Sequence, residues 1–238
     1  MGAPTVPSRR PPRRRLLVIL ALALPAVAIG LAIVFISVGE GGPSVPFEPV
    51  GASETQQLYG GILQDGDRLG SPDAPVTITY FTDLQCEACA AYHFETIPPL
   101  IEDLVRDGEA KLVLRHFSTA ENQTQIAAFA ATAAGEQERQ WQYAHAFFLN
   151  LPQAPGDRIT VDFLRGVAGT LLEFDESDWE EELDTAEVEG RVESDGQEAI
   201  ELLLPAEPAV VVEGAGGMRE LPRSPSLAEI ESAVEEVR

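Results

Sequence analysis

The sequence of 238 residues predicts an α/β domain, and three patterns along the chain indicate this fold class. The first is a strand–helix–strand pattern over residues 76–117, in which the two strands should run parallel. The second is an alanine-rich and aromatic stretch over about residues 121–204 with helical spacing. The third is a strand, a turn, a short partner strand and a helix at the C-terminal end. Because strand signals return after the helical stretch, we expect those helices to be an insertion within one domain over residues 58–238.

The N-terminal segment differs in composition from everything that follows it. Residues 1–15 contain five arginines among prolines, and residues 16–38 contain no charged residue. An apolar run of this length can cross a bilayer at about 1.5 Å per residue. It is longer than the apolar region of a cleaved signal peptide, which has roughly 7–15 residues. The length therefore favours a transmembrane signal-anchor, with cleavage near the small residues around Leu24 as the alternative.

The arginines also predict the orientation of this anchor, because positively charged residues before a span favour the cytoplasmic side. We expect a single-pass cell-membrane protein held in the lipid bilayer by residues 16–38. Its basic tail over residues 1–15 would be cytoplasmic, and the domain over residues 58–238 would be extracytoplasmic. Residues 39–57 are rich in Gly, Pro, Ser and Glu and predict a flexible linker between span and domain.

The charge of the exported part is strongly negative. All 39 acidic residues follow residue 39, against 11 basic residues there (16 minus the five in the tail), which gives a net charge of −28. Nucleic acids and anionic membrane surfaces bind through clustered positive charge. The composition therefore argues against nucleic-acid binding, and we interpret the acidity as a solubility feature.

The only two cysteines, Cys86 and Cys89, follow the β-branched and aromatic strand over residues 76–82. A Cys-x-x-Cys motif at a strand-to-helix junction places its first sulfur on the unpaired N–H groups and the positive end of the helix. Such a position stabilises a thiolate, which is the species that attacks disulfides. The second sulfur lies one helical turn further on and can resolve a mixed disulfide. We therefore predict a redox-active dithiol with Cys86 as the nucleophile and Cys89 as the resolving thiol.

Three other interpretations of the two cysteines remain open at this stage. A structural disulfide would close a very short loop and add little stability. A zinc site could use His93 or His116, but the sequence lacks a second well-spaced ligand pair. The cysteines could also be free thiols without a role. An oxidising compartment outside the membrane favours the redox interpretation, because a dithiol can persist there as a disulfide.

The remaining elements follow from spacing and turn residues. The helix opened by Cys86 should kink or restart at Pro98–Pro99 and end near Gly108. Thr160 and Ser177 are candidate helix N-caps. The expected segments are a short edge strand with turns over 58–69, a strand over 110–117, helices over 126–134, 136–150, 161–172 and 187–204, strands over 209–212 and 218–221, and a last helix from Pro225–Ser226.

This arrangement resembles the thioredoxin fold, and specifically its DsbA-like branch of membrane-anchored or exported thiol:disulfide oxidoreductases with an inserted helical domain. Local strings carry the resemblance over residues 58–238. They are Gly-Ser-Pro-Asp-Ala-Pro-Val at 70–76, Phe-Thr-Asp-Leu-Gln-Cys at 81–86, Arg-His-Phe at 115–117, and Trp141 with His145.

The resemblance implies roles for two further residues, and Asp83 is a third candidate because of its position three residues before Cys86. Pro208 would be the cis-proline beside the dithiol, rather than a trans proline that starts a strand. The backbone of Glu207 would pair with substrate as an added strand. Asp83 could assist proton transfer to Cys89, and its alternative is an ordinary turn or N-cap aspartate.

Two positions depart from the pattern of the family. Glu87-Ala88 stands where strong oxidants often carry Pro-His, and Glu207 stands where Thr or Val is common. Both carboxylates should disfavour the thiolate of Cys86, and Glu87 is therefore a candidate for tuning its ionisation. A less stabilised thiolate implies a less oxidising potential than that of the strongest oxidants.

The function implied is exchange of disulfides with exported proteins, and we expect a disulfide donor. A membrane quinone-linked partner of the DsbB or vitamin-K-epoxide-reductase type would regenerate it, and neither an organic cofactor nor a metal is expected. A reductase or isomerase of the same fold remains an alternative because it would use the same residues. Two non-catalytic alternatives are a metal-delivery or assembly module on a thioredoxin scaffold, and a domain that regulates a membrane partner by contact alone.

Overall fold

The computed structural model describes residues 47–119, 125–154, 159–221 and 223–238. The predicted tail over residues 1–15 and the predicted span over residues 16–38 lie outside these ranges, so both stay predictions. Within the described ranges, none of the helices combines the length and the apolar character needed to cross a membrane.

One sheet of six strands, in the order β1-β2-β4-β3-β5-β6, forms the centre of the domain. The strands are β1 (Gln64–Asp65), β2 (Arg68–Leu69), β3 (Val76–Thr82), β4 (Ala110–His116), β5 (Ala209–Gly214) and β6 (Gly217–Leu221). Strands β3 and β4 are parallel, as predicted, and their register runs from Val76 opposite Ala110 to Thr82 opposite His116. All other neighbours pair antiparallel. The central strand β3 therefore ends beside the end of β4, immediately before the two cysteines.

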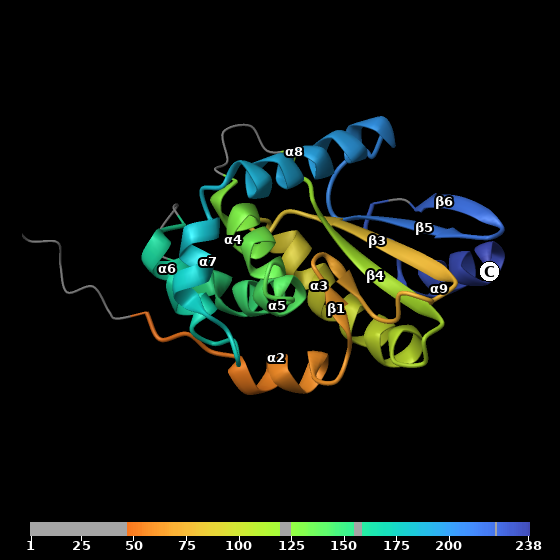
Figure 1. The fold of residues 1–238 in the computed structure, drawn as a ribbon. Helices are drawn as coiled ribbons and strands as arrows, with labels where there is room; N and C mark the ends of the chain where they lie inside the picture. The colour runs from red at the N-terminus through yellow and green to blue at the C-terminus, as the bar shows by residue number, and fades with distance from the viewer. Residues whose placement is uncertain (1–46, 120–124, 155–158, 222) are drawn as a thin grey trace, which may run out of the picture. The chain divides into compact units, whose positions relative to one another are not determined.

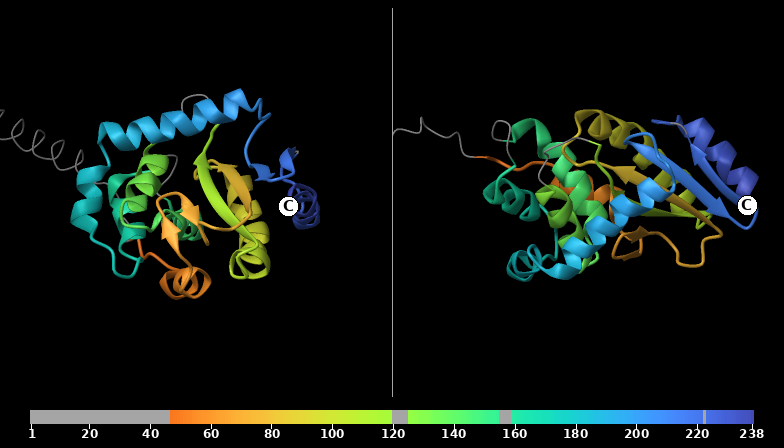
Figure 2. Two further views of the ribbon diagram at one scale, coloured as in Figure 1. Left: turned by 45° about the vertical axis from the view of Figure 1, so that its right-hand side comes forward. Right: turned by 90° about the horizontal axis from the view of Figure 1, so that it is seen from above.

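Figure 1 shows the helices, which are numbered in the order in which they occur along the chain. They are α2 (Ala52–Tyr59), α3 (Glu87–Leu100), α4 (Ile126–Gly135), α5 (Gln140–Asn150), α6 (Val161–Ala168), α7 (Glu176–Glu182), α8 (Ala186–Glu201) and α9 (Leu227–Val237). Helices α4 to α7 gather at one end of the sheet, and α8 runs from them across β4 (Figure 2). The helical stretch between β4 and β5 is thus present as an inserted layer of helices.

The two faces of the sheet bury different side chains, as the alternation of a strand requires. Ile78 and Tyr80 of β3 belong to the main apolar core, together with side chains of α3 and α9. Phe81 points to the other face and forms a smaller core with Val211 of β5 and Ala199 of α8. Helix α8 therefore covers the side of the sheet opposite α3.

Helix α2 is a difference from the sequence prediction. The linker predicted over residues 39–57 does not continue through residues 52–57, because these residues belong to α2. The helix buries Thr55 and Tyr59, and the Tyr59 ring packs edge-on against His145 of α5 at 5.4 Å between ring centroids. Only two of its side chains are buried, so its mostly polar sequence gave no helical apolar stripe to detect.

Pro98–Pro99 do not end the helix, so the predicted restart there is wrong, while the predicted kink stays a prediction. Helix α3 continues through both prolines, because the N–H of Ile101 still bonds to the carbonyl groups of Ile97 and Pro98. The chain then forms a π-helical turn (Ile101–Val105) and stops at Gly108, which has a positive φ of 71°. The stop at Gly108 is confirmed, because a residue without Cβ adopts this conformation without strain.

The N-cap residues of the helices agree with the sequence prediction, with one exception. Thr160 caps α6 by accepting from the N–H of Phe163, and Ser226 forms a capping box with Glu229 at the start of α9. Helix α7, however, is capped by Asp175 rather than by Ser177. The Asp175 carboxylate accepts from two backbone N–H groups, including that of Ser177 itself.

Candidate active site

Cys86 is the N-cap residue of α3, and its backbone is extended just before the first helical turn. Its Sγ accepts a hydrogen bond from the backbone N–H of Cys89 at 3.1 Å. Cys86 is partly exposed, and both cysteines are free thiols in the structure. The N–H group and the positive end of a 14-residue helix both favour negative charge on this sulfur.

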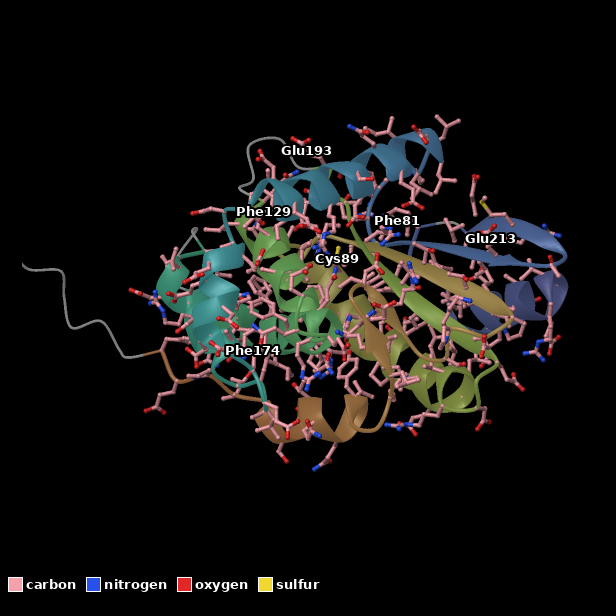
Figure 3. The ribbon with its side chains drawn as sticks, viewed as in Figure 1. Phe81, Cys89, Phe129, Phe174, Glu193 and Glu213 are labelled. Atoms are coloured by element: carbon pink, nitrogen blue, oxygen red, sulfur yellow. The ribbon has the colours of Figure 1, made fainter. Side chains whose placement is uncertain are left out.

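Cys89 lies one turn into α3 and is fully buried, in the interior of the molecule in Figure 3. Burial raises the pKa of its thiol, and the neighbouring Cys86 thiol raises it further. The backbone of Asp83 and the Thr82 hydroxyl act in the opposite direction. The two sulfurs therefore differ in access: Cys86 is partly exposed, whereas Cys89 is buried and its thiol has a raised pKa.

The peptide bond between Glu207 and Pro208 is cis, as predicted. Pro208 is buried and directly precedes β5, whose first residue, Ala209, pairs with Phe81 of β3. This pairing places the cis-proline beside the end of β3, next to the segment that leads to the dithiol. The carbonyl oxygens of Glu207 and Pro208 accept from Arg223 Nε and from the N–H of Ser224, each at 3.1 Å.

The two carboxylates expected near Cys86 lie in different surroundings. Glu87 is exposed in the first turn of α3, where negative charge is favourable to the helix. Glu207 is buried, and its Oε2 accepts from both the N–H and the hydroxyl of Thr119, at 3.1 and 2.8 Å. The described hydrogen bonds of the Glu207 side chain are thus with the loop after β4. Its predicted effect on the Cys86 thiolate stays a prediction.

Asp83 is buried and occupies the turn between β3 and α3. Its Oδ1 accepts from the N–H of Gln85 at 2.8 Å, and its carbonyl oxygen accepts from the N–H of Cys86 at 3.2 Å. Burial raises the pKa of its carboxyl, and the charge of Glu207 raises it further, against hydrogen bonds from Ser118 and Gln85. Asp83 is therefore a turn residue, as the alternative predicted, and its carboxyl holds a proton more tightly than usual. Its role in proton transfer to Cys89 stays a prediction.

The three histidines are buried, and sequence reasoning assigned none of their contacts. His93 Nε2 and His145 Nδ1 lie 3.0 Å apart. Burial lowers the pKa of both, that of His145 to about 4. The histidine considered as a zinc ligand next to Cys89 thus pairs with a histidine of α5 instead. His116 ends β4 opposite Thr82. The two parallel strands have seven residues each, and this equal length is the signal that could have predicted His116 beside Thr82.

The profile of the thioredoxin family matches residues 64–214, which is more than half of the chain and includes both cysteines and the cis-proline. The chain belongs to the thioredoxin family. Among similar proteins is the probable disulfide bond formation protein D of Bacillus cereus, 26% identical over 149 residues, which are 61% of this chain and 69% of that protein. The disulfide bond formation protein D of Bacillus subtilis is 23% identical over 146 residues, or 60% and 66% of the two chains.

Similar solved structures identify the type of thioredoxin fold more precisely. Oxidised BdbD from Bacillus subtilis superposes with a TM-score of 0.63 and 21% identity, over 72% of this chain and 92% of that chain. Wolbachia pipientis alpha-DsbA1 gives a TM-score of 0.60 and 16% identity, over 77% and 94%. These structures confirm the predicted DsbA-like thioredoxin fold with its helical insertion.

Proposed function

We propose that this protein donates disulfide bonds to exported proteins through Cys86 and Cys89, outside the cytoplasmic membrane. The broader class, protein disulfide oxidoreductase, follows from its family, its DsbA-like fold and its relatives named for disulfide bond formation. One observation carries the finer proposal: a partly exposed sulfur caps α3, and a buried sulfur whose pKa is raised lies directly behind it. This asymmetry is what nucleophile and resolving thiols need.

The reaction proceeds by two thiol–disulfide exchanges. A substrate thiolate attacks Cys86 Sγ of the oxidised protein, so the bond between Cys86 and Cys89 breaks and a mixed disulfide forms. Cys89 leaves as a thiolate and takes a proton. A second substrate thiolate then attacks the substrate sulfur of the mixed disulfide, which forms the substrate disulfide and releases Cys86. Two electrons pass from the substrate to the dithiol.

The neighbouring residues support these steps in our proposal. The Glu207 backbone beside Pro208 holds an extended substrate segment as an added strand. Asp83, whose carboxyl holds a proton more tightly than usual, exchanges protons with Cys89. Glu87 adds negative charge at the exposed start of α3 and tunes Cys86.

The direction of transfer and the location are parts of the same proposal. The predicted membrane span would hold the domain in an oxidising compartment, where the disulfide form persists. A membrane quinone-linked partner of the DsbB or vitamin-K-epoxide-reductase type would then accept the two electrons and restore the disulfide. The names of the Bacillus relatives, which refer to disulfide bond formation, support donation over reduction.

Oxidative refolding of a reduced, unfolded ribonuclease by the oxidised full-length chain tests the proposal. The wild-type protein should restore ribonuclease activity, and Cys86→Ser should abolish transfer because it removes the attacked sulfur. Cys89→Ser, with Cys86 first converted to a mixed disulfide with glutathione, should instead exchange the glutathione for substrate and hold it as a mixed disulfide that is visible on a non-reducing gel.

Thr132→Val is the control, because Thr132 is a buried residue of α4 outside the dithiol region and should leave transfer unchanged. Transfer that persists in Cys86→Ser would show that the protein acts without this dithiol.

A further inference from the structure

Arg223 follows β6 and lies beside the cis-proline. The register of β5 and β6 pairs Val210 with Leu221, so the chain that continues from β6 runs back past Pro208. There the N–H of Ser224 bonds to the Pro208 carbonyl oxygen, and Arg223 Nε bonds to the Glu207 carbonyl oxygen, each at 3.1 Å. These two hydrogen bonds fix Arg223 next to the peptide bond at which we propose that substrate pairs.

The loop that carries Arg223 is also tied to the helix of the dithiol. The carbonyl oxygen of the buried Pro225 accepts from the Tyr92 hydroxyl at 2.7 Å. Tyr92 lies on α3, the helix that Cys86 caps, one turn beyond Cys89. Arg223 itself is exposed. Its guanidinium is therefore held at the surface by a loop whose position is set by both the cis-proline and α3.

Arg223 differs from the other arginines in its charged neighbours. Every other arginine in the described ranges forms an ion pair with an Asp or Glu carboxylate, including exposed arginines such as Arg219 and Arg238. Arg223 forms none with a described residue, although the chain contains 39 acidic residues. The carboxylate of Glu207, whose backbone Arg223 contacts, is bonded to Thr119 instead. An arginine kept without a carboxylate in so acidic a domain indicates that its partner comes from another molecule.

The geometry of the guanidinium shows what this partner can be. The group has five N–H donors, of which only the one on Nε has a partner among the described residues. The four donors on Nη1 and Nη2 can bind a carboxylate through two parallel hydrogen bonds. The Glu207 carbonyl oxygen has two lone pairs, so the bond from Arg223 leaves one for an added strand. A substrate segment can therefore pair with Glu207 and reach Arg223 at the same time.

We propose that Arg223 is a specificity residue, which binds an Asp or Glu side chain of the substrate close to the cysteine that reacts with Cys86. The favoured substrates are then segments in which an acidic residue lies near a cysteine. The domain is otherwise strongly acidic and repels such segments, so Arg223 supplies the local attraction that they need. The inference rests on the proposed disulfide exchange at Cys86 and adds no step to it.

The test uses two dithiol peptides that differ only in the residues beside the first cysteine, which are Asp in one peptide and Asn in the other. Each peptide is mixed with the oxidised full-length chain at pH 7 and low salt. The thiols are then trapped with a maleimide and counted by mass. The two second-order rate constants give an Asp-to-Asn ratio for each variant. The intrinsic reactivity of the peptide thiols cancels when these ratios are compared between variants.

Arg223→Gln should lower the Asp-to-Asn ratio about fivefold relative to wild type, because an exposed ion pair is lost. The Gln amide can still donate to the Glu207 carbonyl oxygen, so this variant disturbs the loop little. Arg223→Lys keeps the charge but loses the planar fork, and should lower the ratio less. In about 1 M salt the difference between wild type and Arg223→Gln should shrink, because salt screens exposed charges.

Arg219→Gln is the matched control. It removes the same charge from an exposed arginine of β6, whose partner is Glu236, and should leave the ratio unchanged. An equal fall in Arg219→Gln would overturn the inference, because it would show an effect of net charge rather than a site at Arg223.

A ratio for Arg223→Gln within twofold of the wild-type ratio would also overturn the inference. This holds even if both rates fall together, since that result would show only a structural contact with the cis-proline. Oxidation of both peptides by wild type alongside it would leave the proposed function intact. Failure of wild type to oxidise either peptide would overturn disulfide donation and this inference with it.

Discussion

Arg115 and His116 are neighbours on β4, but they lie in two regions that treat buried polar groups in opposite ways. Arg115 pairs with Asp67, with Asp195 at 3.3 Å and with Glu198 at 2.9 Å. These partners come from the β1–β2 connection and from α8, so the cluster ties the insertion to the sheet. His116 instead lies opposite Thr82 at the end of β3, where Thr82, Asp83 and His116 each carry a buried polar atom without a hydrogen-bond partner among the described residues. The comparison teaches that the charged groups between the sheet and the insertion are paired and hold the fold, whereas the turn before the dithiol keeps buried polar atoms without a partner among the described residues.

The largest effect should come from breaking the paired region. Arg115→Met leaves three carboxylates facing one another, two of them on α8, and should lower the free energy of unfolding by about 2–3 kcal/mol. Urea denaturation at pH 7 measures this loss. Arg219→Met is the matched control, because its pair with Glu236 is exposed and should be worth at most about 1 kcal/mol. Equal losses in the two variants would contradict the structural role of the Arg115 cluster.

Asp195 gives this region a distinct pH dependence. Burial raises its pKa from 3.8 to about 7, against hydrogen bonding from His116 and the charge of Arg115. The folded protein therefore binds this proton more tightly than the unfolded chain. The stability contributed by the group is complete below about pH 4 and is lost as the pH rises to 7. Asp195→Asn should remove this decline and stabilise the protein by about 1–2 kcal/mol at pH 8.

Thermal unfolding of wild type and Asp195→Asn across pH 4–8 checks this expectation. Glu198→Gln, in the same cluster but more exposed, should change the profile much less. Parallel profiles for wild type and Asp195→Asn would show that Asp195 does not titrate in this range.

The smallest change in the free energy of unfolding should come from Asp83→Asn, next to the dithiol, and this variant should also slow disulfide exchange. The pKa of Asp83 is raised by its burial, so its contribution to stability also falls as the pH rises through its folded value. Asp83→Asn should therefore raise stability slightly at pH 8, while disulfide cleavage slows about tenfold. Unfolding midpoints and cleavage rates are measured on the same preparation. Lower stability with an unchanged rate would identify Asp83 as a turn residue only.

Local sequence patterns predicted the parts of the site that depend on neighbouring residues. The Cys-x-x-Cys spacing placed Cys86 at the start of α3, and the strand signal after Pro208 placed the proline at the start of β5. The resemblance to the DsbA-like branch added the cis conformation of its peptide bond. Each of these features is set within a few residues of chain, where turn and capping rules apply directly.

Contacts between distant segments could not be predicted in the same way. The pocket lined by residues of β3, β4, α4 and α8 depends on these elements meeting in space, and the equal lengths of β3 and β4 indicate only that His116 lies opposite Thr82. The pair of His93 and His145 is separated by 52 residues and forms only when α3 packs against α5. Helix α2 was missed because its stability comes from packing against α5 and from few apolar residues.

The equilibrium potential of the Cys86–Cys89 pair in the full-length chain, measured against glutathione buffers, tests the central claim most directly. Donation requires an oxidising dithiol, and the acidic neighbours should make it milder than the strongest oxidants. We predict a value between about −120 mV, typical of DsbA, and about −200 mV. A value near about −270 mV, typical of thioredoxin, would contradict disulfide donation and assign the protein to a reducing or isomerising pathway.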